Sequence, residues 1–288
     1  MKVFYTPKMV ADSASFSPSA AKPKLVVESW LSHGFAIDVI EPRPVTPEQL
    51  YRAHNGNYVD GVLSCRLANG FGNRSQAVAD SLIYTSGAML EAAKAAMLTG
   101  GLACAPVSGF HHACWSKGGG FCTFNGLMVT ALDLLESGAA KTIGILDCDQ
   151  HYGNGTDDII NHLGEESRIV HFTTGKSHFE PVAFLKTFAE RFRNLYAACD
   201  VLLYQAGADP HINDPLGGWM TTAQLHERDR IVFETARAMK LPMAWNLAGG
   251  YQRDANGHIG AVLEIHDNTM RAGLQQTNRT IAAIEQPY

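Results

Sequence analysis

The sequence predicts an α/β fold in which a single, mainly parallel sheet is flanked by helices on both faces. Short apolar and β-branched runs alternate with longer amphipathic runs along the chain, and this rhythm is typical of a parallel sheet. The long irregular segments each follow one of the apolar runs, at the strand ends where parallel sheets bind their ligands. The 288 residues contain no repeat, low-complexity stretch or linker, so we expect one domain over residues 1–288.

Seven runs have the length and composition of strands, and four have clear helical periodicity. The expected strands are residues 2–6, 36–40, 102–105, 142–147, 168–172, 201–205 and 243–247. The clearest helices are residues 77–98, 126–135, 182–196 and 222–239. Another helix is predicted to begin after Thr46, because Pro47 is suited to a first helical position and Gln49 can close a capping box with Thr46.

Composition excludes several classes of function. The net charge is −5 and no run of lysines or arginines occurs, so we expect no nucleic-acid partner. No apolar stretch approaches the roughly 18 to 20 residues that a membrane span needs. The first residues are broken too early by Pro7 to form a signal peptide. The six cysteines form no CxxC pair, as is usual in a reduced compartment, and we expect a cytoplasmic protein.

The most informative segment is an Asp-x-Asp-x-His pattern formed by Asp147, Asp149 and His151 directly after an apolar strand. Residues two apart in an extended chain project to the same side, so these groups can face one point. Carboxylates and imidazole suit Zn²⁺ or Fe²⁺. Asp209 follows another predicted strand and would complete a three-ligand site. Taken singly, each aspartate is better explained as the cap of a helix or as a turn residue, and it is their parallel placement that favours a metal site.

Three further loops carry groups suited to catalysis. The adjacent His111 and His112 follow a predicted strand, and imidazole can take a proton from water and deliver it to a leaving amine. Gly120 permits a close approach of backbone to substrate, and Phe121 can wall a narrow channel. Tyr251 follows two glycines and is suited to donate a hydrogen bond to the oxygen of a tetrahedral intermediate. Taken alone, each of the two glycine loops also fits an ordinary turn with a packed aromatic ring, and a single histidine is more often structural or exposed.

Together these segments resemble the histone deacetylase superfamily, which includes bacterial acetylpolyamine amidohydrolases and acetoin-utilisation proteins. The matching stretches occur in the family's order and are residues 109–113, 120–125, 147–156, 207–209 with 214–217, and 249–251. The resemblance implies the arginase/deacetylase fold, with an active site in the loops at the carboxyl ends of the strands. It also implies a zinc-dependent hydrolase that cleaves the acetyl or acyl amide of a lysine-like or polyamine-like amine.

The resemblance implies a role for each candidate residue. The implied ligands of the catalytic metal, Zn²⁺ or alternatively Fe²⁺, are Asp149, His151 and Asp209. The implied catalytic residues are His111, His112, Asp147 and Tyr251. The implied substrate contacts are Gly120, Phe121, Gly249 and Gly250.

Within the implied catalytic group, Asp147 orients His111, and its backbone helps to bind a structural K⁺ ion. His112 is the proton shuttle, and Asn154 stands where relatives have the polar partner of that second histidine. Tyr251 polarises the scissile carbonyl.

Two other functions stay open at this point. One is a dimanganese ureohydrolase on the same fold, and the other is a non-catalytic homologue that binds an acylated small molecule. The segment 13–22 lacks the His-Pro-Glu…Arg pattern that is usual in the family, so we expect an unusual pocket rim. The sequence leaves open the acyl group, the amine and the oligomeric state, and for the last of these a homo-oligomer is the expectation.

Overall fold

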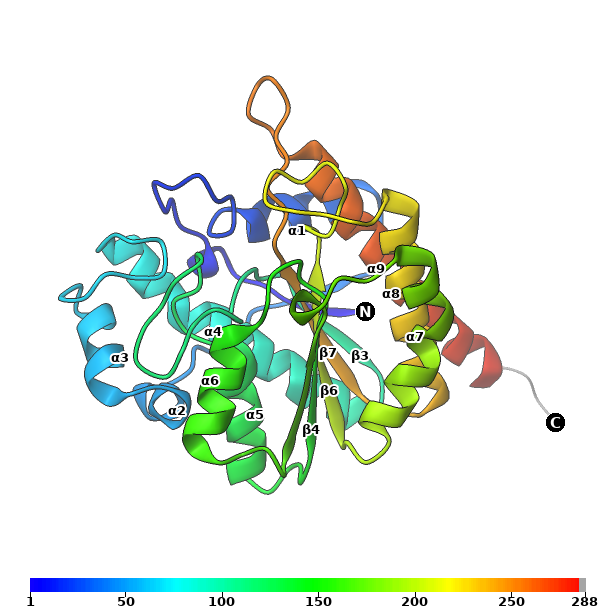
Figure 1. Ribbon diagram of the computed structural model, residues 1–288, viewed down its shortest axis with the longest axis horizontal. Helices are drawn as coiled ribbons and strands as arrows, with labels where there is room; N and C mark the ends of the chain where they lie inside the picture. The colour runs from blue at the N-terminus through cyan, green and yellow to red at the C-terminus, as the bar shows by residue number, and fades with distance from the viewer. Residues whose placement is uncertain (285–288) are drawn as a thin grey trace.

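The computed structural model describes the backbone of residues 1–284 and the side chains of residues 1–277 (Figure 1). Within this part of the chain, seven strands form one sheet in the order β2-β1-β3-β7-β6-β4-β5, and every neighbouring pair is parallel. The strands are β1 (Lys2–Phe4), β2 (Asp38–Ile40), β3 (Leu102–Ala105), β4 (Ile143–Asp147), β5 (Ile169–Thr173), β6 (Val201–Gly207) and β7 (Met243–Ala248). The predicted fold class is confirmed, and each predicted strand is present.

Helices cover both faces of the sheet (Figure 1). On one face lie α2 (Pro47–Ala53), α3 (Gly56–Leu63), α4 (Gln76–Thr99), α5 (Gly126–Glu136) and α6 (Asn154–Leu163). On the other lie α1 (Lys22–Ser32), α7 (Pro181–Tyr196), α8 (Thr222–Ala238) and α9 (Gly260–Ile284). Each layer encloses its own apolar core against the sheet. Short 3₁₀ turns form η1 (Pro7–Met9) and η2 (Thr174–Lys176).

Among the described residues, five helices match ranges predicted from the sequence, and no range was predicted for the other four. The capping box of α2 is present, with the Thr46 hydroxyl accepting from the Gln49 N–H and the Gln49 side chain accepting from the Thr46 N–H. The unpredicted helices are α1, α3, α6 and α9. In α9 the buried face includes polar residues such as His266 and Thr269, so burial along this helix does not follow the apolar residues alone. In α6 the first turn contains Asn154 and Gly155, which in sequence resemble a turn.

The strand register brings three loops to one edge of the sheet. Asp147 at the end of β4 pairs with Gln205 in β6, and Gly207 at the end of β6 pairs with Ala248 at the end of β7. All residues of these three strands are buried. The chain therefore leaves β4, β6 and β7 at neighbouring points, and those loops carry most of the candidate residues.

Candidate active site

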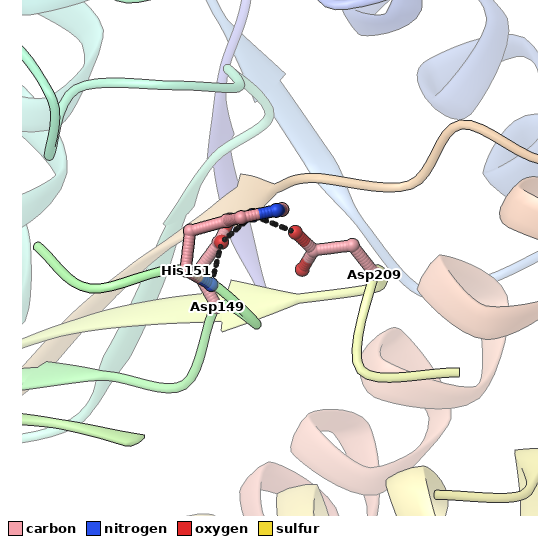
Figure 2. Close-up of side chains that lie close together, drawn as sticks. All are labelled: Asp149, His151 and Asp209. Carbon is pink, nitrogen blue, oxygen red and sulfur yellow. Dashed lines mark hydrogen bonds and ion pairs between the residues drawn. The ribbon is translucent and has the colours of Figure 1, made fainter. Parts of the chain in front are cut away.

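Three metal-type donors converge at this edge of the sheet. Asp149 and His151 come from the loop after β4, and Asp209 comes from the loop after β6 (Figure 2). The Nδ1 atom of His151 lies 3.1 Å from Oδ1 of Asp149 and 3.0 Å from Oδ2 of Asp209. One ligand atom from each residue lies within 4.8 Å of the others. Both carboxylates are buried, which requires a compensating positive charge.

The surrounding contacts orient these donors. The His151 Nε2–H donates to the Leu216 carbonyl at 3.1 Å, which leaves Nδ1 facing the carboxylates. The Asp149 side chain also accepts from the His151 backbone N–H, and the Asp209 side chain accepts from the Gln150 N–H. An imidazole with a fixed tautomer and two hydrogen-bonded carboxylates form a donor set that fits Zn²⁺ or Fe²⁺.

Electrostatic interactions shift the pKa values of all three candidate metal ligands. The hydrogen bonds from Asp149 and Asp209 raise the pKa of His151 to about 11. Burial, together with the charge of Asp149, raises the pKa of Asp209 well above its usual range. Burial acts to raise the pKa of Asp149 too, but His111 and His151 outweigh it, so the pKa of Asp149 lies below its usual range. These opposing shifts come from two carboxylates and an imidazole packed together, which is a donor set that a bound cation would stabilise.

His111 is buried beside this cluster and is held by Asp147. Its Nδ1–H donates to Oδ2 of Asp147 at 2.7 Å, and its Nε2 lies 3.7 Å from Oδ1 of Asp149. Burial alone would lower the pKa of His111, but the charges of Asp147 and Asp149 outweigh it and raise the pKa to about 9. Asp147 is itself held by the Asp149 N–H and by the Gln205 side-chain amide, each 3.1 Å from its Oδ1.

His112 stacks against His111, with ring centroids 4.0 Å apart. Its Nδ1–H donates to Oδ1 of Asn154 at 2.6 Å, so its Nε2 is left as a proton acceptor. Burial, followed by the charge of His111, lowers the pKa of His112. Gly120 has a positive φ of 53°, and a Cβ at this position would overlap the His112 ring. The glycine loop therefore lies directly against the second histidine.

Tyr251 stands on the loop after β7. The two preceding residues, Gly249 and Gly250, have φ of 49° and 89°, and a Cβ on Gly249 would overlap the Asp209 carboxylate. The Tyr251 N–H donates to Oδ2 of Asp214 at 2.8 Å, which fixes the loop backbone. Its ring is nearly buried and lies 5.8 Å, centroid to centroid, from Phe121. Burial, with the charges of Asp149 and Asp209, raises the pKa of the Tyr251 phenol.

The structure thus brings all twelve candidate residues into one cluster. Contacts link His111 to Asp147 and Asp149, His112 to Asn154 and Gly120, Gly249 to Asp209, and Tyr251 to Phe121. The sequence did not predict Lys22, which is 0% exposed and whose ammonium donates to the Gly249 carbonyl. Burial lowers the pKa of Lys22 to about 8, against the charge of Asp209.

No signal in the sequence distinguishes Lys22 from Lys24, an exposed residue of the same helix. Asp214 and Gln205 were also given no role by the sequence, although both bind site residues. Asp214 lies within one of the family stretches, and this was the available signal.

The fold and the site indicate a class of α/β enzymes with a candidate metal site at the carboxyl edge of a parallel sheet. A family model described as the histone deacetylase domain matches residues 18–179 and 164–263. The chain therefore belongs to the histone deacetylase family, and the resemblance of its motifs is confirmed. Its homologues are deacetylases and amidohydrolases, which are hydrolases that act on amide bonds.

Individual relatives agree with this assignment. The chain is 29% identical over 259 residues to an uncharacterized protein of Picosynechococcus, covering 78% of this chain and 85% of that protein. It is 37% identical over 107 residues to an acetylpolyamine amidohydrolase of Mycoplana ramosa, covering 37% and 27% of the two chains. Its fold is similar to the HDA15 HD domain, with a TM-score of 0.78, 19% identity and coverage of 96% and 90%. Among the described residues, no helix has the length and apolarity that a membrane span requires.

Proposed function

We propose that this protein is a zinc-dependent amidohydrolase that removes an acetyl or similar acyl group from a lysine-like or polyamine-like amine. The observation that carries the proposal is that three metal donors, two adjacent histidines and one buried tyrosine lie on neighbouring loops at one edge of the sheet. The proposed metal ligands are Asp149, His151 and Asp209. The names of the relatives support an acylated amine as the substrate.

The chain's own groups are suited to each part of amide hydrolysis. Bound Zn²⁺ would supply the Lewis acidity that polarises a carbonyl and activates water. The Tyr251 phenol, whose pKa is raised by burial, stays protonated and donates to the carbonyl oxygen as that oxygen becomes negative. Gly120, Phe121 and the Gly249-Gly250 turn are the proposed contacts of the substrate.

The histidine pair is suited to move the protons. Because His112 uses Nδ1 to donate to Asn154, its Nε2 is free to accept a proton from the attacking water. His111 is held by Asp147 in one orientation and lies in ring contact with His112. The pair then delivers a proton to the amine as the carbon–nitrogen bond breaks.

A single metal ion is favoured over a dimanganese site. Among side chains 1–277, Asp149, His151 and Asp209 are the one group of three such donors whose ligand atoms all lie within 4.8 Å of each other. A dinuclear ureohydrolase needs further carboxylates to bridge two metals. The neighbouring Asp147 instead uses its carboxylate on His111, Gln205 and the Asp149 backbone.

We also propose a domain organisation, a cellular location, a K⁺ site and an oligomeric state. One continuous sheet with a core on each face supports a single catalytic domain over residues 1–288. The scattered free cysteines support a cytoplasmic location. A structural K⁺ ion beside Asp147 and a homo-oligomeric state are further proposals, based on family resemblance and on the frequency of oligomers.

The test is acetate release by zinc-loaded protein from acetyl-lysine peptides, acetylpolyamines and small acetamides. Tyr251→Phe is the matched variant, because it removes one hydroxyl and keeps the ring. We expect this variant to bind one equivalent of zinc and to lose about 10²- to 10³-fold in kcat, as is typical for loss of one oxyanion donor. Equal turnover by the two proteins would refute the proposed role of Tyr251, and no release from any substrate class with one zinc bound would favour a binding protein.

A further inference from the structure

Phe16 lies in the N-terminal segment that departs from the family pattern, yet its ring packs on the proposed catalytic tyrosine. The ring centroids of Phe16 and Tyr251 are 6.0 Å apart and the planes differ by 14°. Phe121 contacts the same tyrosine ring at 5.8 Å and 48°. Phe16 is 53% exposed, whereas Tyr251 is 7% exposed, so Phe16 lies on the solvent side of this contact.

The segment around Phe16 is held at several points. The Phe16 carbonyl accepts from Nη2 of Arg253 at 3.2 Å, and Nη1 of Arg253 donates to the Gly257 carbonyl at 2.7 Å. The Asn73 side chain donates to the Ser13 carbonyl at 2.7 Å. The bond from Arg253 joins the N-terminal segment to the loop after β7, which carries Tyr251, and the bond from Asn73 joins it to the loop before α4.

The orientation of the Tyr251 ring depends on packing. Among the described residues, the hydrogen bond found for Tyr251 is the one from its backbone N–H to Asp214, which holds the backbone and not the ring. The two glycines before it have left-handed backbones and add no side-chain packing. Ring contacts therefore fix the side chain, and offset aromatic pairs stabilise one orientation beyond simple burial.

We propose that Phe16 is a positioning residue for the Tyr251 phenol, held in place by Arg253. The catalytic consequence rests on the function proposed above, whereas the positioning itself does not. Loss of the Phe16 ring should let the phenol leave its productive orientation, and this affects the chemical step more than substrate binding.

Two measurements test the inference. In protein labelled with 3-fluorotyrosine, the ¹⁹F resonance of Tyr251 is identified among the nine tyrosines by its loss in Tyr251→Phe. We expect Phe16→Ala to shift or broaden that resonance, and Phe16→Tyr, which keeps the ring, to restore it. Steady-state kinetics should show kcat lowered about three- to tenfold in Phe16→Ala with KM little changed, and recovered in Phe16→Tyr.

Leu31→Ala is the matched control, because it also truncates a half-exposed apolar side chain, 56% exposed, and lies near the opposite end of α1 from Lys22, which contacts the Tyr251 loop. It should leave both readouts unchanged. A Tyr251 resonance that is the same in Phe16→Ala and wild type would overturn the inference, as would an unchanged kcat in an active enzyme. If wild type is inactive on all substrates but the resonance moves, the positioning stands and the proposed function falls.

Discussion

Asp147→Asn is the perturbation whose effect the structure defines most sharply. The carboxylate is fully buried and uses both oxygens, with Oδ2 accepting from His111 and Oδ1 accepting from Gln205 and from the Asp149 N–H. An amide has one acceptor side and one donor side. If its oxygen faces His111, its NH₂ group opposes two N–H donors. If its NH₂ group faces His111, the imidazole must adopt the opposite tautomer.

The size of the effect follows from these contacts. Two buried donors without acceptors cost about 1–3 kcal/mol each, so we expect a loss of about 2–6 kcal/mol in the free energy of unfolding. Loss of a correctly oriented acid–base residue typically lowers turnover by about 10²- to 10⁴-fold. The charge that raises the pKa of His111 is also removed, so that pKa should fall.

Urea denaturation of wild type and Asp147→Asn measures the first effect, and kcat/KM for the best acetylated substrate measures the second. Asp133→Asn is the control, because Asp133 is a buried carboxylate that pairs with Arg52 and Lys94 away from the site. It should lose stability and keep its kcat/KM. If Asp147→Asn unfolds at the same urea concentration as wild type and has the same kcat/KM, the hydrogen bond from His111 to Asp147 contributes to neither stability nor turnover.

Two further predictions concern pH and metal. The fully buried His54 donates to the Cys114 carbonyl and accepts from the Asn125 N–H, and burial lowers its pKa from 6.5 to about 4. The unfolded chain therefore binds the proton first, and stability should fall as pH drops from 6.5 to 4, by about 2.5 kcal/mol near pH 4.5. His54→Gln should lack this part of the pH dependence in urea titrations, and equal slopes would contradict the assignment. Zinc at about 100 times its Kd should stabilise wild type by about 2.7 kcal/mol in thermal melts, and Asp209→Ala should lose both this stabilisation and the bound metal. Retention of one tightly bound zinc by that variant would exclude Asp209 as a ligand.

The sequence was sufficient for the sheet because each strand is a short apolar run that ends in polar residues. The sequence also predicted the three candidate metal ligands, because Asp149, His151 and Asp209 each follow such a run closely. Parallel strands place those positions at one edge. Among the helices, α9 was missed, and its buried face includes the polar His266 and Asp267.

Contacts between distant segments could not be predicted. Lys22 and Phe16 lie more than 200 residues from the loop that they contact, and neither carries a local pattern that distinguishes it from surface residues. Their environment depends on how α1 and the preceding segment lie over the loop after β7. Only tertiary packing sets that arrangement, and single-residue propensities contain no information on it.

The position of β7 has a consequence for synthesis of the chain. Among the strands that the structure describes, β7 is made last, yet it lies between β3 and β6 in the middle of the sheet. Until residue 248 has left the ribosome, the earlier strands can form only two separate groups, β2-β1-β3 and β6-β4-β5, each with an unpaired inner edge. Exposed apolar edges of this kind are prone to aggregate. The nascent chain therefore carries two three-stranded groups with aggregation-prone edges until β7 pairs with both of them. Slow translation before β7 should lower the yield of folded protein.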